Sequence, residues 1–254
     1  MDLGLSDRVY VITGASGGLG KACAEQLVSE GARLVLSGRD ETALAKTAAG
    51  LGGSERAIPI SGDLTDPGIE TCLVAAAVAR YGRLDGALIS VGQPDPGSVT
   101  DTDDGAWRMA FESYFLGPLR LARAVARNAS HEGGSLVMVL STSVREPAEG
   151  MALSNAMRPA LAMTSKNLAE ELGPRNVRVN GILPGRIDTE RTRALDAAAG
   201  RPEDTRRAAE ARIPLGRYGD PLEFARPAVF LLSPAASYVT GTLLTVDGGQ
   251  TRSV

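Results

Sequence analysis

The 254-residue chain contains few of the side chains that ligate metals or form disulfide bonds. It has two cysteines, Cys23 and Cys72, and a single histidine, His131. Two cysteines without metal-like spacing build neither a zinc site nor a disulfide framework, so we expect no bound metal and a reducing, cytoplasmic environment. The lone histidine falls in an apparent surface turn, which gives no indication of a Ser-His catalytic pair.

The chain also lacks a strong charge and a long apolar run. Its formal net charge of -3 provides no basic field for nucleic acid. No apolar stretch reaches membrane-spanning length, and Asp2, Asp7 and Arg8 interrupt any signal-peptide pattern at the start. With 43% hydrophobic and 22% charged residues, the composition is that of an ordinary globular domain. We therefore expect a protein that binds neither nucleic acid nor membrane.

Short aliphatic runs alternate with longer helical patterns along the whole chain. The runs lack a polar face, as strands covered on both sides of a sheet do. Alternating strands and helices predict a single α/β domain built on a doubly wound parallel sheet, with helices on both faces. The segment around 190–215, rich in Ala, Arg and acidic residues, predicts a helical insertion on the substrate side. The expected strands are 9–12, 33–36, 57–60, 87–90, 136–140 and 177–182.

A glycine-rich loop follows the first expected strand and opens a helix over 18–29. Glycines there let the backbone turn tightly and approach a pyrophosphate, whose charge is favoured at a helix N-terminus. The alternative is a tight turn with no ligand. The candidate cofactor contacts in this loop are Gly14, Ser16, Gly18, Leu19 and Gly20.

The end of the second expected strand indicates which cofactor is bound. An acidic residue there would bind the ribose hydroxyls of NAD, but the chain has Ser37 and Arg39 instead. A guanidinium binds phosphate bidentately, so we expect NADP(H) in preference to NAD(H). The alternative is a solvated Arg39 paired with Asp40, and Gly17 stands where a second basic residue would strengthen the case.

Three motifs together resemble the short-chain dehydrogenase/reductase family: Thr-Gly-Ala-Ser-Gly-Gly-Leu-Gly at 13–20, Leu-Pro-Gly-Arg-Ile-Asp-Thr at 183–189 and Val-Asp-Gly-Gly at 246–249. The resemblance covers essentially the whole chain. It implies one NAD(P)-binding Rossmann-type domain over residues 1–254 and a homodimer or homotetramer. It also implies further cofactor contacts at Asp63, Leu64, Ser90, Gly92, Pro184, Gly185, Ile187 and Thr189.

The family's Tyr-x-x-x-Lys pair is replaced. Counting back from Glu170-Glu171-Leu172 places Ser154 at the tyrosine position and Arg158 at the lysine position, while Ser141 keeps the family's interval of thirteen residues before Ser154. Ser141 can still hydrogen-bond a substrate carbonyl. The hydroxyl of Ser154 is a much weaker acid than a phenol. Arg158 cannot shuttle protons, but it can bind ribose hydroxyls or stabilise an oxyanion.

Tyr114 is a candidate replacement for the missing acid. It lies in a segment, 107–117, that resembles the family helix with an active-site asparagine, and it takes the asparagine position. One hypothesis is a relocated acid whose phenolate is favoured by Arg158. The alternative is a packing residue that fills the space left by the smaller Ser154.

The substrate is not indicated. Arg186, Arg191 and Arg193 would attract an acidic substrate, or they belong to a solvated helix face balanced by Asp188, Glu190 and Asp196.

Two functions follow from these residues. The first is an atypical NADP(H)-dependent oxidoreductase that acts on a small carbonyl or alcohol, similar to a 3-oxoacyl reductase. The second is a non-catalytic NADP(H)-binding protein, a sensor or a supporting subunit. A pocket with Tyr114 pointing into it favours the enzyme, whereas a pocket plugged by Leu153 or Met157 favours binding alone.

Overall fold

Seven parallel strands form one sheet in the computed structural model, which describes residues 2–198 and 200–253. The strand order β3-β2-β1-β4-β5-β6-β7 reverses between β1 and β4, so the sheet is doubly wound as predicted. The strands are β1 (Val9–Thr13), β2 (Arg33–Gly38), β3 (Ala57–Ser61), β4 (Gly86–Ile89), β5 (Gly134–Val139), β6 (Val177–Pro184) and β7 (Leu243–Val246).

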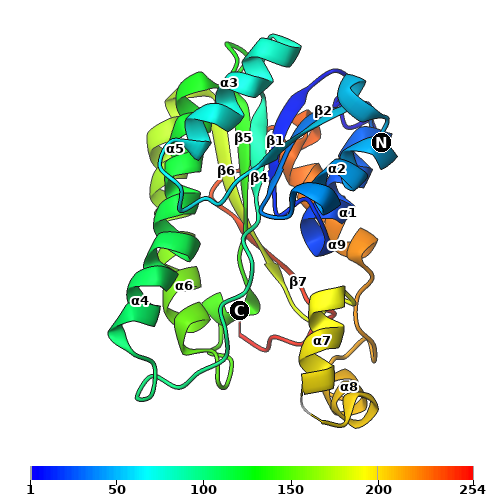
Figure 1. Ribbon diagram of the computed structural model, residues 1–254, viewed down its shortest axis with the longest axis vertical. Helices are drawn as coiled ribbons and strands as arrows, with labels where there is room; N and C mark the ends of the chain where they lie inside the picture. Colours follow the sequence, from blue (N-terminus) through cyan, green and yellow to red (C-terminus); the bar gives the residue numbers. More distant parts are fainter. Residues whose placement is uncertain (1, 199, 254) are drawn as a thin grey trace.

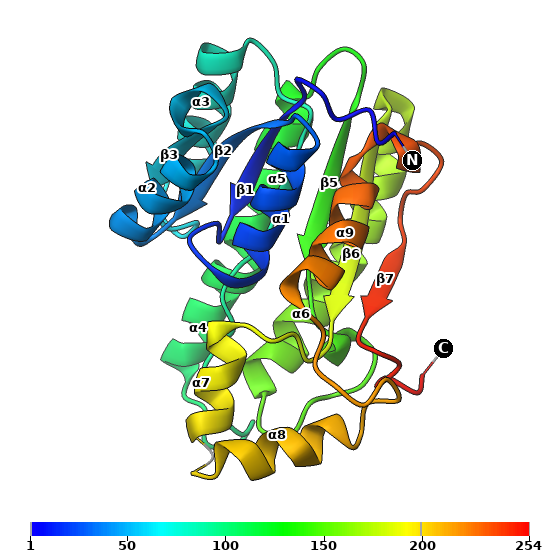
Figure 2. The ribbon, with the colours of Figure 1, turned by 90° about the vertical axis from the view of Figure 1, so that its right-hand side faces the viewer.

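Helices cover both faces of this sheet (Figures 1 and 2). One layer consists of α1 (Gly18–Ser29), α2 (Glu41–Gly50) and α9 (Pro221–Leu232). The other consists of α3 (Ile69–Tyr81), α5 (Gly117–Asn128) and α6 (Ala152–Leu172), and α4 (Asp104–Phe111) packs against α6 beyond the sheet. Short 3₁₀ turns connect elements at Gly53–Glu55, Thr142–Val144, Gly173–Arg175 and Pro234–Ala236.

The absence of a polar face on the central strands is explained by the two hydrophobic cores. Along β1, Tyr10 and Ile12 pack into the core under α1 and α9, whereas Val9 and Val11 pack into the core on the opposite face. Because successive side chains of a strand point to opposite faces, a strand covered on both faces must be apolar throughout. The predicted α/β fold is confirmed.

Strand β7 was not predicted. It is an edge strand of four residues that pairs with β6, placing Leu243 opposite Gly181, and all four of its residues are half-buried. A short half-buried strand carries neither a long apolar run nor a clear alternation, so its sequence signal is weak. The other predicted strand ends differ from the observed ones by one or two residues.

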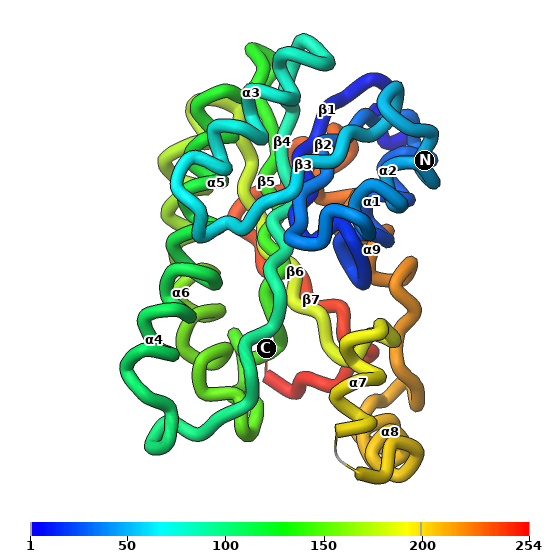
Figure 3. The backbone as a smooth tube through the Cα atoms, viewed as in Figure 1, coloured from blue at the N-terminus to red at the C-terminus, as the bar shows by residue number. Residues whose placement is uncertain are grey.

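Two helices lie beyond the carboxyl ends of the strands, in the segment where the sequence indicated a helical insertion. They are α7 (Glu190–Ala198) and α8 (Pro202–Glu210). In Figure 3, α4 and the α7–α8 segment stand on opposite sides of the strand ends. The region between them is where ligands bind in open α/β sheets.

One helical segment is interrupted by a π turn. Residues Glu112–Leu116 form this turn between α4 and α5, and Tyr114 is its central residue. An isolated π turn interrupts the regular hydrogen-bond pattern of an α-helix, and such turns are frequent at functional sites. Among the described residues, no helix is both long and apolar enough to span a bilayer.

Candidate active site

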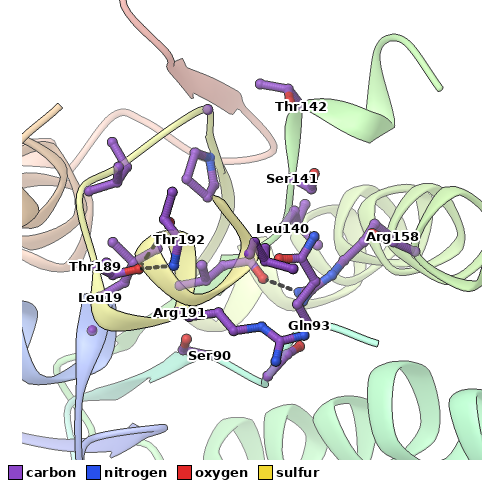
Figure 4. Close-up of a pocket in the computed structure, with 18 of the residues that line it drawn as sticks. Leu19, Ser90, Gln93, Leu140, Ser141, Thr142, Arg158, Thr189, Arg191 and Thr192 are labelled. Carbon is purple, nitrogen blue, oxygen red and sulfur yellow. Dashed lines mark hydrogen bonds between the residues drawn. The ribbon is translucent and has the colours of Figure 1, made fainter. Parts of the chain in front are cut away.

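A cleft of about 1640 Å³ opens at the carboxyl ends of the strands, between the glycine loop and α7 on one side and the start of α6 on the other. Figure 4 shows residues from these elements around it. Every site residue predicted from the sequence lines this one cleft. The structure therefore brings together the expected cofactor contacts and the four candidate catalytic residues.

The glycine loop has the geometry that close approach to a phosphate requires. Gly14 and Gly18 have positive φ angles of 63° and 51°, which side chains rarely adopt. A Cβ on Gly20 would collide with the carbonyl oxygen of Gly14. Helix α1 has no side-chain cap and no acidic residue in its first turn, so its first backbone N–H groups are available to an anion. These residues fit a dinucleotide diphosphate.

Thr13 and Ser90 join the two strands at which the sheet order reverses. The Thr13 hydroxyl donates to the Ser90 carbonyl at 2.7 Å, and the Ser90 N–H donates to the same hydroxyl at 2.8 Å. Close packing accompanies this pair, because a Cβ on Gly14 would lie 3.0 Å from the Ser90 oxygen. Thr13 was not among the predicted site residues, although its place at a strand end inside the glycine motif was a signal for it.

Arg39 faces Asp63 in the cleft, with its Nε 3.9 Å from the carboxylate. Its side chain is 81% exposed, so its guanidinium is accessible to a ligand. The solvated position suggested as the alternative fits this exposure, but the ion-pair partner of Arg39 is Asp63 and not Asp40, whose carboxylate accepts the Ala43 N–H at 2.9 Å and caps α2. Ser37 is buried at the end of β2.

Three serines, the candidate catalytic Ser141 and Ser154 and the intervening Ser143, lie between the end of β5 and the first turn of α6. The Ser141 Oγ accepts the Ser143 N–H at 3.1 Å, which leaves the proton of the Ser141 hydroxyl able to donate to a ligand. Ser154 is only 2% exposed, and its Oγ lies 3.5 Å from the Ser143 Oγ, a long separation for a hydroxyl pair. Among the described residues, the Ser154 hydroxyl meets the Ser143 hydroxyl and no base, so the structure does not activate it.

The guanidinium of Arg158 donates hydrogen bonds to backbone carbonyl oxygens. Its Nη1 donates to the Val139 oxygen at the end of β5 at 2.6 Å, and its Nη2 donates to the Gly92 oxygen at 2.9 Å. The residue is 4% exposed, its Nε has no partner, and it makes no ion pair with any described carboxylate. Burial lowers the pKa of Arg158 to about 10, with a small opposing effect from Tyr114, so the guanidinium is still a cation at neutral pH.

Tyr114 lies at the cleft beside this cation, with the Arg158 Cζ 5.9 Å from the centroid of its ring. Burial raises the pKa of the phenol above its ordinary value of 10.0, while Arg158 lowers it by less. Arg158 thus lowers the pKa of Tyr114 as the hypothesis requires, but burial raises it by more, so the phenolate is not the favoured form. At neutral pH Tyr114 is a protonated phenol, because desolvation outweighs the nearby positive charge.

The arginines in and beside the α7–α8 segment differ in whether they form an ion pair with a carboxylate. Arg193 and Arg206 lie 2.8 and 3.3 Å from the Asp188 carboxylate, and Arg186 lies 3.4 Å from the buried Asp196. These belong to the charge-balanced face that the sequence suggested as an alternative. Arg191 lines the cleft without an ion pair to any described residue.

The two side chains that the sequence suggested as plugs do not line the cleft. Tyr114 is among its lining residues, whereas Leu153 and Met157 are not. The lining also includes Gln93, which the sequence placed beside the pocket, and the tail residues Gln250, Thr251 and Arg252, which sequence reasoning missed. The tail is held in place by Glu146, which accepts the backbone N–H groups of Arg252 and Ser253 at 3.0 and 2.8 Å.

Comparison with known proteins connects this geometry to a family. A family model described as enoyl-(acyl carrier protein) reductase matches residues 14–251. An uncharacterized oxidoreductase of Mycobacterium tuberculosis (strain CDC 1551 / Oshkosh) is 37% identical over 250 residues, which cover 97% of this chain and 93% of the relative. The chain belongs to the short-chain dehydrogenase/reductase family.

Two further relatives of this family indicate its chemistry. Cis-4-hydroxycyclohexanecarboxylate dehydrogenase of Sinomonas cyclohexanicum is 32% identical over 97% of both chains. The crystal structure of L-sorbose reductase from Gluconobacter frateurii, a complex with NADPH and L-sorbose, superposes with a TM-score of 0.95 at 29% identity and covers 100% of both chains. The protein is thus an oxidoreductase of the short-chain dehydrogenase type.

Proposed function

We propose that this protein is an NADP(H)-dependent reductase that interconverts a carbonyl and an alcohol on a small molecule without the family's Tyr-Lys pair. The observation that carries the proposal is the position of Tyr114, a protonated phenol that lines the same cleft as the glycine loop, Ser141 and Arg158. A preference for NADP(H) is supported by the exposed Arg39 and by the NADPH in the related L-sorbose reductase.

Each cleft residue has a defined part in this proposal. The N-terminus of α1 binds the diphosphate, and Arg39 binds the 2′-phosphate. The cofactor supplies the hydride. Ser141 donates its hydroxyl proton in a hydrogen bond to the substrate carbonyl oxygen, and Tyr114 transfers its proton to that oxygen as the alcohol forms. Arg158 is then a positioning residue, which fixes the loop after β4 and stabilises negative charge on the phenol oxygen after transfer.

The substrate is proposed only by class. A relative acts on a hydroxycyclohexanecarboxylate and another binds L-sorbose, so both are small polar molecules. We also infer self-association as a homodimer or homotetramer. Met109 of α4 and Met163 of α6, on helices that pack together, are 70% and 67% exposed. Analytical ultracentrifugation of the protein tests this inference, and a monomer at all concentrations would contradict it.

The function is tested by cofactor titration followed by a screen of carbonyl substrates. NADPH and NADH binding is measured by fluorescence, and NADPH oxidation is measured on ketoses, cyclic ketones and 3-oxoacyl thioesters. The variants are Tyr114→Phe and the double change Ser154→Tyr with Arg158→Lys, with Tyr81→Phe as a control because its phenol bonds the Ser54 carbonyl away from the cleft. Tight NADPH binding without hydride transfer to any carbonyl class would overturn the proposal in favour of a non-catalytic NADP(H)-binding protein.

A further inference from the structure

The C-terminal tail, residues 250–253, crosses the cleft on the side of Ser141. Strand β7, from which the tail leaves, lies beside β6, and β6 lies beside β5. Figure 1 shows the tail in red, running from the side of α7 and α8 to the C-terminus. Its far end is bonded to Glu146, in the loop that follows β5. Because neighbouring strands lie about 4.8 Å apart, the tail spans roughly 10 Å and passes the carboxyl end of β6.

The near end of the tail is fixed by the turn that follows β7. The carboxylate of Asp247 accepts the backbone N–H groups of Gly249 and Thr251 at 2.9 and 2.7 Å. The Leu215 N–H, in the segment after α8, donates to the Gly248 carbonyl at 3.2 Å. These bonds hold the chain as far as Thr251, so a movement of the tail would begin beyond that residue.

The far end of the tail depends on one side chain. The Oε1 atom of Glu146 accepts the backbone N–H groups of Arg252 at 3.0 Å and Ser253 at 2.8 Å, and no other group among the described residues accepts them. The bond from Ser253, and next that from Arg252, lowers the pKa of the Glu146 carboxyl below its ordinary value of 4.5, so it is charged at neutral pH. A single carboxylate therefore sets the position of residues 252 and 253.

This anchor lies one turn from the residue proposed to bind the substrate carbonyl. The Glu146 N–H donates to the Thr142 carbonyl at 3.2 Å, and Thr142 directly follows Ser141. Figure 4 shows Ser141 and Thr142 on the side of the pocket opposite Leu19 and Ser90. The cleft lining on this side consists of Ser141, Thr142, Glu146, Gln250, Thr251 and Arg252. The tail and the loop after β5 thus form one wall of the space beside the carbonyl-binding serine.

We propose that Glu146 is a positioning residue that determines substrate size, because it holds the C-terminal tail as a wall of the substrate pocket. The inference rests on the proposed carbonyl reduction and deepens it. With the anchor in place, Arg252 lies against the cleft and the pocket accepts small carbonyl compounds. Without the anchor the chain beyond Thr251 is released. Small substrates then lose enclosing contacts, and larger ones gain room.

The anchor is tested by hydrogen exchange, which needs neither cofactor nor turnover. Backbone exchange in the tail is measured for the full-length wild type, Glu146→Ala, Glu146→Gln and the control Glu149→Ala. Glu149 is an exposed carboxylate of the same loop and bonds no described residue. Protection of the Arg252 and Ser253 N–H groups is expected to be lost in Glu146→Ala and unchanged in Glu149→Ala. Glu146→Gln retains an acceptor oxygen and is expected to keep part of the protection.

The wall is tested by kinetics with paired substrates of different size. KM and kcat with NADPH are measured for cyclohexanone and 4-phenylcyclohexanone, and for the acetoacetyl and 3-oxodecanoyl thioesters of N-acetylcysteamine. Glu146→Ala is expected to raise the KM of the smaller member of a pair by about 3- to 10-fold. The ratio of kcat/KM for the larger member to that for the smaller is expected to rise by about 10-fold. The dissociation constant of NADPH is expected to stay unchanged, because the anchor lies outside the glycine loop.

A second variant separates the tail from the charge of Glu146. Proline has no N–H group, so Ser253→Pro removes one of the two donors and leaves the carboxylate in place. It is expected to shift the size preference in the same direction as Glu146→Ala and by less. Added to Glu146→Ala, it is expected to change nothing further, because the bond is already absent. Additive shifts would mean that Glu146 acts on the substrate directly, and would overturn the inference.

The remaining outcomes are equally decisive. Full tail protection in Glu146→Ala overturns the anchor, and lost protection with an unchanged size preference overturns the wall. A wild type that reduces no carbonyl contradicts the proposed function and removes the specificity role with it, while hydrogen exchange still decides whether Glu146 holds the tail. Equal melting temperatures of Glu146→Ala and Glu149→Ala exclude a general loss of structure as the cause of the shifts.

Discussion

The guanidinium of Arg158 lies beside the ring of Tyr114, with 5.9 Å between its Cζ atom and the ring centroid. The same guanidinium is bonded to the carbonyls of Val139 and Gly92. The aromatic face and these carbonyl oxygens carry partial negative charge. They surround the buried guanidinium, which has no carboxylate partner among the described residues. Removing either member of the pair changes the environment of the other, and the two residues are best tested separately.

Replacement of the phenol tests whether Tyr114 supplies the proton. Tyr114→Phe retains the ring beside Arg158 but loses the acidic hydroxyl, so kcat for carbonyl reduction is expected to fall about 10²- to 10⁴-fold. NADPH affinity is expected to change little. Steady-state and single-turnover rates are compared with those of Tyr81→Phe, and an unchanged kcat in Tyr114→Phe would mean that the tyrosine only fills space.

The pH dependence of reduction follows from the pKa of the same phenol. Burial raises this pKa above its ordinary value more than Arg158 lowers it, so Tyr114 keeps its proton through neutral and mildly basic pH. A general acid is active below its pKa and inactive above it. The kcat for reduction is therefore expected to be flat from pH 6 to about 9 and to decline only above the ordinary phenol value. A decline that begins near neutrality would indicate another acid.

Replacement of Arg158 by lysine tests its role as a positioning residue. One ammonium cannot reproduce the spread of the guanidinium over the Val139 and Gly92 carbonyls, which lie on different strand ends. Arg158→Lys is expected to lower the free energy of unfolding by about 1 to 3 kcal/mol, measured by urea titration. Arg123→Lys, an exposed change on α5 away from the cleft, is the control.

The preference for NADP(H) depends on Arg39. Arg39→Ala is expected to weaken NADPH binding roughly 10-fold or more while NADH binding changes little, because only NADPH carries the 2′-phosphate. Titration of both cofactors measures the ratio of their dissociation constants. Equal losses for NADPH and NADH would show that Arg39 does not recognise the 2′-phosphate, and Arg123→Ala serves as a charge-matched control.

The close approach at Gly20 gives a prediction for the glycine loop. A methyl group at Gly20 collides with the Gly14 carbonyl, so Gly20→Ala is expected to lower stability by about 1 to 3 kcal/mol and to weaken both cofactors. Gly50→Ala at the end of α2 meets no atom within 4 Å and is expected to be neutral or slightly stabilising. Thermal unfolding of the two variants makes the comparison, and a fully stable Gly20→Ala would contradict the tight turn.

The order of elements and the cofactor loop could be predicted because their causes are local. The apolar run at Val9–Thr13 and the glycines after it specify a buried strand, a turn and a helix start within one short segment. The edge strand β7 was missed because its four half-buried residues have no such local signature.

The contacts of the catalytic end could not be predicted, because they join distant segments. Arg158 lies 19 residues from Val139 and 66 from Gly92, and Thr13 lies 77 from Ser90. Only the folded sheet brings these carbonyls to the side chains that bind them. The pKa of Tyr114 depends likewise on how deeply the folded chain buries its ring, whereas the sequence showed only the charge beside it.

The π turn at Glu112–Leu116 determines which side chain of this segment lies beside Arg158. Such a turn accommodates one residue more than the regular helix around it, and each residue of an α-helix rotates the next side chain by roughly 100°. Deleting one residue there would restore a regular helix and turn a neighbour of Tyr114 toward the cleft. Gain or loss of a single residue in this turn would thus exchange the side chain beside Arg158 without any substitution.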